Sequence, residues 1–281
     1  MQEPTVSVLM AVYEGTPAEQ LELALGSVAE QTRPADEVVI VEDGPISQRH
    51  LDVLCDFETR LAHVTRLRLP VNRGQGMANQ AGLAVATGTW IAKADADDIS
   101  MPHRFERQLH HLRETNADVC GAALLEFAQD HRSPIARRDG PLMHEQIARR
   151  MRLNNPVNHP TAMFRRAAAL RAGGYPDMRF AEDYVLFARM WAAGARFTNL
   201  PDPLVYFRAD TGMHERRALR GQLGDEWRLQ QELRRVGVVS ARRRWWNFAV
   251  RLGYRSLPLP IRRVVHERLL GRKAGAEDSD G

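Results

Sequence analysis

Three aspartates, Asp95, Asp97 and Asp98, follow a short apolar stretch at residues 90–92. Carboxylates this close together repel one another, so such a group is typical of a site that binds a hard cation. The alternative is a solvated turn that caps a helix expected to begin at residues 101–102, because Asp is favoured at such positions. Since the group stands at the end of a predicted strand, we favour a divalent-cation site that accepts phosphates.

Other polar residues follow the ends of earlier predicted strands. Asp43 comes after the apolar run 38–41, and its carboxylate could accept a hydrogen bond from the imide N–H of a nucleobase. The alternative is an ordinary turn aspartate before Gly44. Tyr13 and Glu14 follow the first apolar run and would line the same pocket, unless they are plain surface residues.

The segment 72–76, Asn-Arg-Gly-Gln-Gly, is a glycine-bearing loop that enters a predicted helix. The N–H groups at such a helix start receive anions, so Arg73 is a candidate contact to a phosphate or a base. The loop has neither the Walker ending nor the glycine spacing of a dinucleotide-binding motif, which excludes both of those interpretations.

A second acidic group, Glu182 and Asp183, opens a predicted helix that runs to Ala193. Acidic residues in a first helical turn are ordinary partners of the helix dipole, and that interpretation stays open. A carboxylate here could instead take a proton from an attacking hydroxyl. His159 precedes an apolar strand and is either structural or part of the site.

Apolar runs alternate with amphipathic stretches over the first 116 residues, which indicates βαβ units and a mainly parallel α/β sheet with helices on both faces. Ligands collect at the carboxyl ends of such strands. The second half predicts a strand at 118–128, helices at 144–152 and 182–193, and strands near 196–199 and 204–207.

The composition bounds the remaining possibilities. The chain has 281 residues and a formal charge of +4, and its basic excess lies beyond residue 200, where 17 Lys and Arg face 10 Asp and Glu. Arginine replaces lysine almost everywhere, so we infer no nucleic-acid binding from this charge. The two cysteines lack metal-ligand spacing, and no apolar run is long enough to span a bilayer. We expect a cytoplasmic protein that is either free or peripheral at the inner face of the cell membrane.

Four stretches of the sequence, taken in order, resemble the family 2 glycosyltransferases, which have the GT-A fold. They are VSVLMAVYE, EVVIVEDG, NRGQGMANQAGLAVATGTWIAKADADDISMPHR and AEDYVLFARM. A further stretch resembles the members of this family that act in bacterial capsule and exopolysaccharide synthesis. It reads LPDPLVYFRADTGMHERR. The resemblance predicts a GT-A domain at 1–214, with a nucleotide-sugar-binding half at 1–116 and an acceptor half at 117–214. A helical, Arg-rich extension follows at 215–281.

The resemblance also implies residue roles. Asp97, with Asp95, would bind Mn²⁺ or Mg²⁺ between the phosphates of a nucleotide-sugar donor, and Asp95 could also reach the ribose. Asp43 would contact the base, and Asp183 would act as the catalytic base beside Glu182 in an inverting transfer from a UDP-linked sugar. One departure is Asp210, which stands where many relatives have a histidine and leaves the third metal ligand open, with Arg208, Arg216 and Arg217 as other phosphate contacts.

The C-terminal stretch combines arginines at 242–244 with Trp245 and Phe248 at helical spacing. This pattern suits the interface of an anionic membrane and a lipid-linked glycan acceptor, and a terminal helix docked on the domain is the alternative. Two rival functions remain: a non-catalytic nucleotide-sugar-binding subunit of a polysaccharide assembly complex, and a sugar nucleotidyltransferase. Nucleotidyltransferases usually carry a Gly- and Arg-rich loop after the first strand. This chain lacks such a loop, which argues against the second rival.

Overall fold

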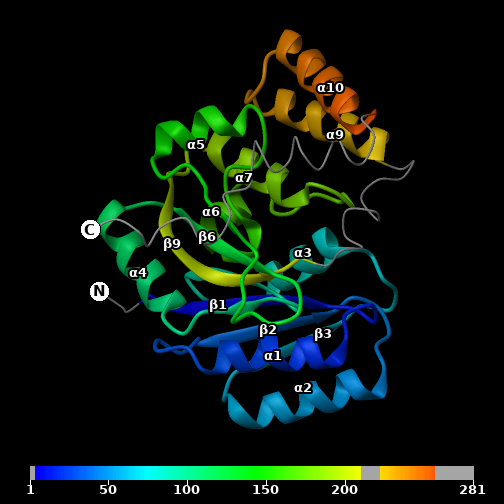
Figure 1. Cartoon of the computed structure of the whole chain (residues 1–281), viewed down its shortest axis with the longest axis vertical. Helices are drawn as coiled ribbons and strands as arrows, with labels where there is room; N and C mark the ends of the chain where they lie inside the picture. Colours follow the sequence, from blue (N-terminus) through cyan, green and yellow to red (C-terminus); the bar gives the residue numbers. More distant parts are fainter. Residues whose placement is uncertain (1–3, 210–221, 257–281) are drawn as a thin grey trace.

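The computed structural model describes residues 4–209 and 222–256. Nine strands form one sheet in the order β3-β2-β1-β4-β8-β6-β9-β5, with β7 paired to β6 (Figure 1). The strands are β1 (Val6–Val12), β2 (Glu37–Glu42), β3 (Val64–Arg68), β4 (Trp90–Asp95), β5 (Ile99–Ser100), β6 (Val119–Phe127), β7 (Ala136–Arg138), β8 (Met163–Arg165) and β9 (Phe197–Arg208). The helices are α1 (Ala18–Ala29), α2 (Gln48–Arg60), α3 (Gln75–Val85), α4 (Arg104–Thr115), α5 (His144–Met151), α6 (Arg166–Arg171), α7 (Glu182–Ala192), α9 (Gln222–Arg235) and α10 (Ala241–Ser256), with one 3₁₀ turn, η1 (His159–Thr161).

The first half confirms the predicted parallel sheet. Strands β3, β2, β1 and β4 pair parallel with one another. The apolar runs of β1, β2 and β4 are buried on both faces, as central parallel strands require, whereas β3, at the edge of the sheet, is partly exposed. Successive residues alternate between two cores: Leu9 and Ile91 pack on the side of α3 and α7, while Val8 and Met10 pack on the side of α1 and α4.

The second half continues the same sheet with mixed pairing, beyond the parallel strands of the first half. Strand β8 is antiparallel to both β4 and β6, whereas β6 and β9 are parallel. The two strands predicted near 196–199 and 204–207 are one long strand, β9, whose register against β6 shifts around Ala122 and Ala123. A bulge of this kind absorbs the break in the apolar pattern at residues 201–203.

The start of α4 differs from the sequence prediction. We expected a helix from residues 101–102, but Ile99 and Ser100 first form β5, which pairs antiparallel with Tyr206 and Val205 of β9. The helix therefore begins at Arg104. A two-residue strand has too little pattern to be detected in sequence, and its partner is more than a hundred residues away.

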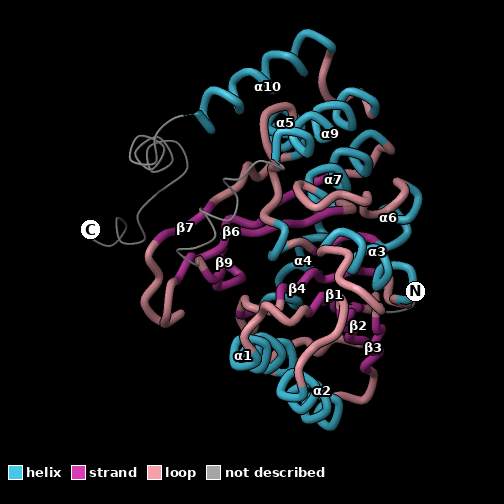
Figure 2. Tube along the Cα trace, turned by 90° about the vertical axis from the view of Figure 1, so that its right-hand side faces the viewer, coloured by secondary structure: helices cyan, strands magenta, loops and turns pink. Residues whose placement is uncertain are grey.

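Helices α9 and α10 stack beyond α5 and α7, at the end of the molecule opposite α1 and α2 (Figures 1 and 2). Leu229 and Leu233 of α9 belong to the same core as α7. Asp210, Arg216 and Arg217 lie outside the described residues. Within the described ranges, no helix is both long and apolar enough to cross a membrane.

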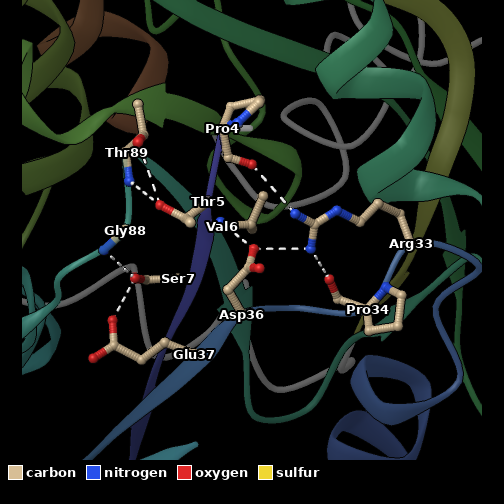
Figure 3. Close-up of polar contacts among 10 residues, drawn as sticks. All are labelled: Pro4, Thr5, Val6, Ser7, Arg33, Pro34, Asp36, Glu37, Gly88 and Thr89. Carbon is tan, nitrogen blue, oxygen red and sulfur yellow. Dashed lines mark hydrogen bonds and ion pairs between the residues drawn. The ribbon is translucent and has the colours of Figure 1, made fainter. Parts of the chain in front are cut away.

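The amino-terminal edge of the sheet is closed by local polar pairs (Figure 3). Ser7 Oγ donates to Glu37 and accepts from the N–H of Gly88 at 2.8 Å. Asp36 accepts from the N–H of Val6 at 2.7 Å and pairs with Arg33 at 2.8 Å. Any side chain at position 88 would collide with Ser7, since an added Cβ would lie 2.5 Å from its Oγ. This edge is therefore used for structure, and the functional groups gather at the other one.

Candidate active site

Asp95 is the last residue of β4, and a buried cation holds it in place. The ammonium of Lys93, which has no exposed surface, donates to Asp95 Oδ1 at 2.5 Å and to the carbonyl of Ala94 at 2.5 Å. Gln75, the first residue of α3, donates to the same carboxylate oxygen at 2.8 Å. Burial alone would raise the pKa of Asp95, but Lys93, together with His159 and Arg104, outweighs it, and the pKa is lowered. Asp95 is thus ionised and fixed in orientation.

Asp97 and Asp98 have the opposite tendency. Burial, followed by the charge of Asp95, raises the pKa of Asp97 to about 6, and the same causes raise the pKa of Asp98 well above its ordinary value. Asp98 Oδ1 accepts from the N–H of Arg208 at 2.8 Å, whereas its Oδ2 is buried and has no hydrogen-bond partner among the described groups. The neighbouring cations therefore do not neutralise all of the negative charge that the three carboxylates carry when ionised.

These carboxylates suit a divalent cation that also takes ligands from a substrate. Among the residues described, no three His, Cys, Asp or Glu side chains form a complete metal site. Mg²⁺ and similar ions are commonly held by one or two carboxylates together with substrate phosphates, and so do not need a full protein cage. The orphaned oxygen of Asp98 and the raised pKa of Asp97 both fit a cation that would relieve the repulsion.

A second buried cation supports the cluster from behind. Arg104, at the start of α4, donates to the carbonyl of Lys93 at 2.6 Å and to Ser100 Oγ at 3.0 Å. Its Nε donates to Gln108, which in turn donates to the carbonyl of Thr161 at 2.8 Å. Burial lowers the pKa of Arg104 to about 10, which still leaves it charged at neutral pH. The network ties β4, α4 and η1 together beneath the carboxylates.

Asp43, at the end of β2, organises the neighbouring loop. Its two carboxylate oxygens accept from the N–H groups of Arg73 and Gly74, at 2.7 and 2.9 Å. Gly74 has a φ of +87°, a conformation that favours glycine, and it forms the N-cap of α3. Asp43 is buried, so its main role in this structure is to hold the loop in shape, and any contact with a base would be secondary. The Arg73 side chain is half-exposed and lies 3.8 Å from Asp177.

The second acidic pair opens α7 and meets the first turn of α3. A Cβ added at Gly76 would lie 3.0 Å from Glu182 Cβ and 2.9 Å from the carbonyl of Met178, so only glycine allows this approach. Glu182 is buried, and burial, followed by the charge of Asp183, raises its pKa to about 8. Asp183 Oδ2 accepts from Asn155 Nδ2 at 2.7 Å. Asp183 thus has a neutral hydrogen-bond donor, and Glu182 carries a proton at neutral pH.

His159 lies buried in η1 between the two acidic groups. Its Nε2 is 2.9 Å from the hydroxyl of Tyr175, and its ring packs edge-on against Tyr175 and Phe187. Burial lowers its pKa, although Asp183 and Asp95 both act in the other direction. A neutral imidazole held by a tyrosine hydroxyl is well placed to shape the floor of the site.

The structure gathers most of the predicted residues but leaves two apart. Tyr13 is half-exposed, and Glu14 accepts from the N–H of Ser47 at 2.6 Å, so both belong to the loop between β1 and α1. In the described part of the chain, no hydrogen bond or ion pair joins either of them to the carboxylates. The sequence analysis missed Lys93 and Asn155. Lys93 is one of only two lysines in the chain, and a lysine within an apolar strand was the available signal.

The chain is similar to several known proteins. The model of Glycosyl transferase family 2 matches residues 7–174. An uncharacterized glycosyltransferase of Haemophilus influenzae is 34% identical over 94% of this chain and 98% of its own. Amylovoran biosynthesis glycosyltransferase AmsE of Erwinia amylovora is 33% identical over 93% and 98%. A UDP-Gal:alpha-D-GlcNAc-diphosphoundecaprenol beta-1,3-galactosyltransferase of Escherichia coli is 28% identical over 96% and 98%.

Solved structures share the fold. Residues 1–349 of TarS from S. aureus, in complex with UDP-GlcNAc, align with a TM-score of 0.67 at 20% identity, over 94% of this chain and 75% of that one. The mannosyltransferase PcManGT of Pyrobaculum calidifontis, in complex with GDP-Man and Mn²⁺, aligns with a TM-score of 0.64 at 16% identity, over 95% and 80%. The fold is GT-A, the match to the family model covers more than half of the chain, and the protein belongs to glycosyltransferase family 2.

Proposed function

We propose that this glycosyltransferase moves a sugar, with inversion, from a UDP-linked donor to a hydroxyl of a lipid-linked oligosaccharide during assembly of a surface polysaccharide. The observation that carries the proposal is the meeting of two acidic groups of different character across the first turn of α3. Asp95, Asp97 and Asp98 lie on one side, and Glu182 and Asp183 lie on the other.

On the donor side, Asp97 and Asp95 would hold a divalent cation, Mn²⁺ or Mg²⁺. When bound, that cation neutralises charge on the departing nucleoside diphosphate. Asp98 keeps the end of β9 against this loop through the N–H of Arg208. The loop at 72–74, fixed by Asp43, directs the start of α3 towards the same edge, where the helix dipole favours phosphate.

On the acceptor side, Asp183 would accept the proton of the attacking hydroxyl. The acceptor oxygen forms a bond to the anomeric carbon, the bond from that carbon to the diphosphate breaks, and the proton goes to Asp183. Glu182 retains its own proton at neutral pH because burial, followed by the charge of Asp183, raises its pKa. Asn155 donates to Asp183 and fixes the direction of its carboxylate.

The names of similar proteins support the choice of donor and acceptor. The galactosyltransferase relative uses UDP-Gal and a diphosphoundecaprenol-linked sugar, TarS was solved with UDP-GlcNAc, and AmsE serves amylovoran synthesis. PcManGT was solved with GDP-Man, so a GDP-linked donor is the alternative to be tested.

A lipid-linked acceptor favours peripheral attachment to the membrane through α10. One side of this helix docks on the domain, where Asn247 donates to the carbonyl of Arg152 at 2.9 Å and Arg251 pairs with Glu226 at 3.1 Å. Trp245 and Trp246 are 56% and 64% exposed. The two alternatives from the sequence are therefore compatible, because a docked helix can still present tryptophans to an anionic interface.

A transfer assay tests the proposal directly. The purified chain is incubated with UDP- and GDP-sugars and a diphosphate-lipid-linked acceptor, with Mn²⁺ or with EDTA, and the anomeric configuration of the product is read by NMR. We expect transfer from a UDP-sugar, dependent on the cation, with inverted configuration. Retained configuration would refute the mechanism. Donor binding without transfer or hydrolysis would favour the non-catalytic subunit, and release of pyrophosphate from a sugar phosphate and UTP would favour the nucleotidyltransferase.

A further inference from the structure

A hollow of about 560 Å³ lies between the end of α5 and the turn that joins α9 to α10. Figures 1 and 2 both place these three helices together, away from the nucleotide half. Val238 and Val239 form a buried apolar floor. The polar walls come from both sides: Arg149 and Arg152 from the end of α5, and Arg243 from the first turn of α10.

The charge of this hollow is unbalanced. Among the described residues, no carboxylate lines it. In the same part of the chain, none of the three arginines pairs with an acidic side chain; Arg149 and Arg152 are exposed, and Arg243 is half-buried. By contrast, the half-buried Arg189 pairs with Glu232 at 2.6 Å. The Nε of Arg243 is buried and has no hydrogen-bond partner among the described residues.

The start of α10 adds to the imbalance. Residues 242–244 are three arginines in a first helical turn that has no acidic residue. Cations there oppose the helix dipole, which makes them unfavourable for the helix. Arg244 has a structural explanation, because it stacks on Trp227 and Trp245 at 4.7 and 5.2 Å. Arg243 has no such contact, and a bound anion would offset both its charge and the dipole.

A purely structural explanation accounts for only part of the cluster. Arg149 lies in the last turn of α5, where a cation is an ordinary partner of the dipole. That does not explain Arg243, which belongs to another helix. Arg152 lies three residues before Asn155, whose side chain holds Asp183. The chain that forms one wall of the hollow therefore continues, three residues later, to a residue of the acceptor side of the site.

We propose that this hollow, formed by Arg149, Arg152 and Arg243, binds a phosphate or diphosphate group. Guanidinium groups from two helices present forked donors that match phosphate oxygens. Ser240 Oγ already accepts from the N–H of Arg243 at 3.2 Å, so the side chains, rather than the backbone of α10, supply the donors. Two sources have this chemistry: the diphosphate of a lipid-linked acceptor and the headgroup of an anionic lipid. Assignment to the acceptor rests on the proposed function, whereas the anion site itself does not.

The site is tested by titrating inorganic pyrophosphate in EDTA, so that the carboxylate cluster has no cation with which to bind it. The variant Arg149→Gln, Arg152→Gln, Arg243→Gln should bind at least tenfold more weakly than wild type. The matched control removes three exposed arginines elsewhere, Arg113→Gln, Arg171→Gln, Arg196→Gln, and should bind within twofold of wild type. Absence of pyrophosphate binding by wild type, or equal loss in both triple variants, would overturn the proposal.

Two further arms identify the source. If the acceptor supplies the diphosphate, the triple variant should raise KM at least tenfold for a diphosphate-linked acceptor and leave KM unchanged for the same glycan without phosphates and for the donor. If a lipid headgroup supplies it, the variant should instead lose sedimentation with phosphatidylglycerol vesicles. Absence of transfer to every acceptor would refute the proposed function alone, because the pyrophosphate titration needs no activity.

Discussion

The two acidic groups of the site are supported in opposite ways. Asp95 rests on the buried ammonium of Lys93, with Arg104 behind it. Asp183 rests on the neutral amide of Asn155, and its neighbour Glu182 has a pKa raised to about 8. In the first group Asp95 keeps its charge, whereas in the second Glu182 keeps a proton. A cation site and a proton acceptor need these two different environments, and the sheet supplies them within one edge.

The largest effect should follow from breaking the cationic support. Lys93→Met leaves Asp95 buried without its ammonium, and removing one partner of a buried ion pair destabilises a protein by about 3–5 kcal/mol. Urea denaturation followed by circular dichroism measures this loss. The second change Asp95→Asn, made in the Lys93→Met background, should restore a large part of it.

The matched change at the other group is Asn155→Ala, which removes a neutral donor to a carboxylate. It should lower stability by only about 1–3 kcal/mol. Equal losses for Lys93→Met and Asn155→Ala would show that the two groups are supported alike and would contradict the comparison.

Removing the proton acceptor should affect rate rather than stability. Asp183→Asn keeps the size of the side chain but cannot take the proton, so kcat should fall by roughly 10²-fold or more, with donor affinity unchanged. Asp177→Asn is the control, because Asp177 is an exposed aspartate just before the same helix. If Asp183→Asn retains near-wild-type transfer, the base lies elsewhere, and Glu182 is the next candidate.

A smaller effect concerns pH. Folded Glu182 keeps its proton up to about pH 8, whereas the unfolded chain releases it near 4.5, so this group makes stability fall as pH rises between those values. Glu182→Gln should remove that contribution and flatten the curve. Melting temperatures of wild type and variant from pH 5 to 8 measure the difference. Parallel curves would mean that the pKa of Glu182 is not raised.

Sequence predicted the parts of this molecule that depend on local pattern. The strand that ends at Asp95 and the helix that opens at Glu182 were both predicted, because apolar runs and acidic ends are visible in a short window. The residues that support these elements were not predicted. Lys93 and Asn155 act through contacts that only the folded chain creates, and β5 exists because of a strand more than a hundred residues later.

Tyr13 and Glu14 were predicted from the end of a strand alone. Their position at the end of β1 suggested the nucleotide pocket, but Glu14 is held by the N–H of Ser47, and their roles in binding remain predictions. The end of a strand fixes where a residue starts, whereas the loop that follows decides where its side chain points.

The most direct test of the account is the cation dependence of donor binding at the first acidic group. UDP is titrated calorimetrically into wild type, Asp97→Ala, Asp183→Asn and the exposed-site control Asp56→Ala, each with and without Mn²⁺. We predict that Mn²⁺ strengthens binding at least tenfold in wild type, Asp183→Asn and Asp56→Ala. Asp97→Ala should lose this increment while its melting temperature is not lowered, because one of several crowded carboxylates has been removed. Undiminished stimulation by Mn²⁺ in Asp97→Ala would contradict the account.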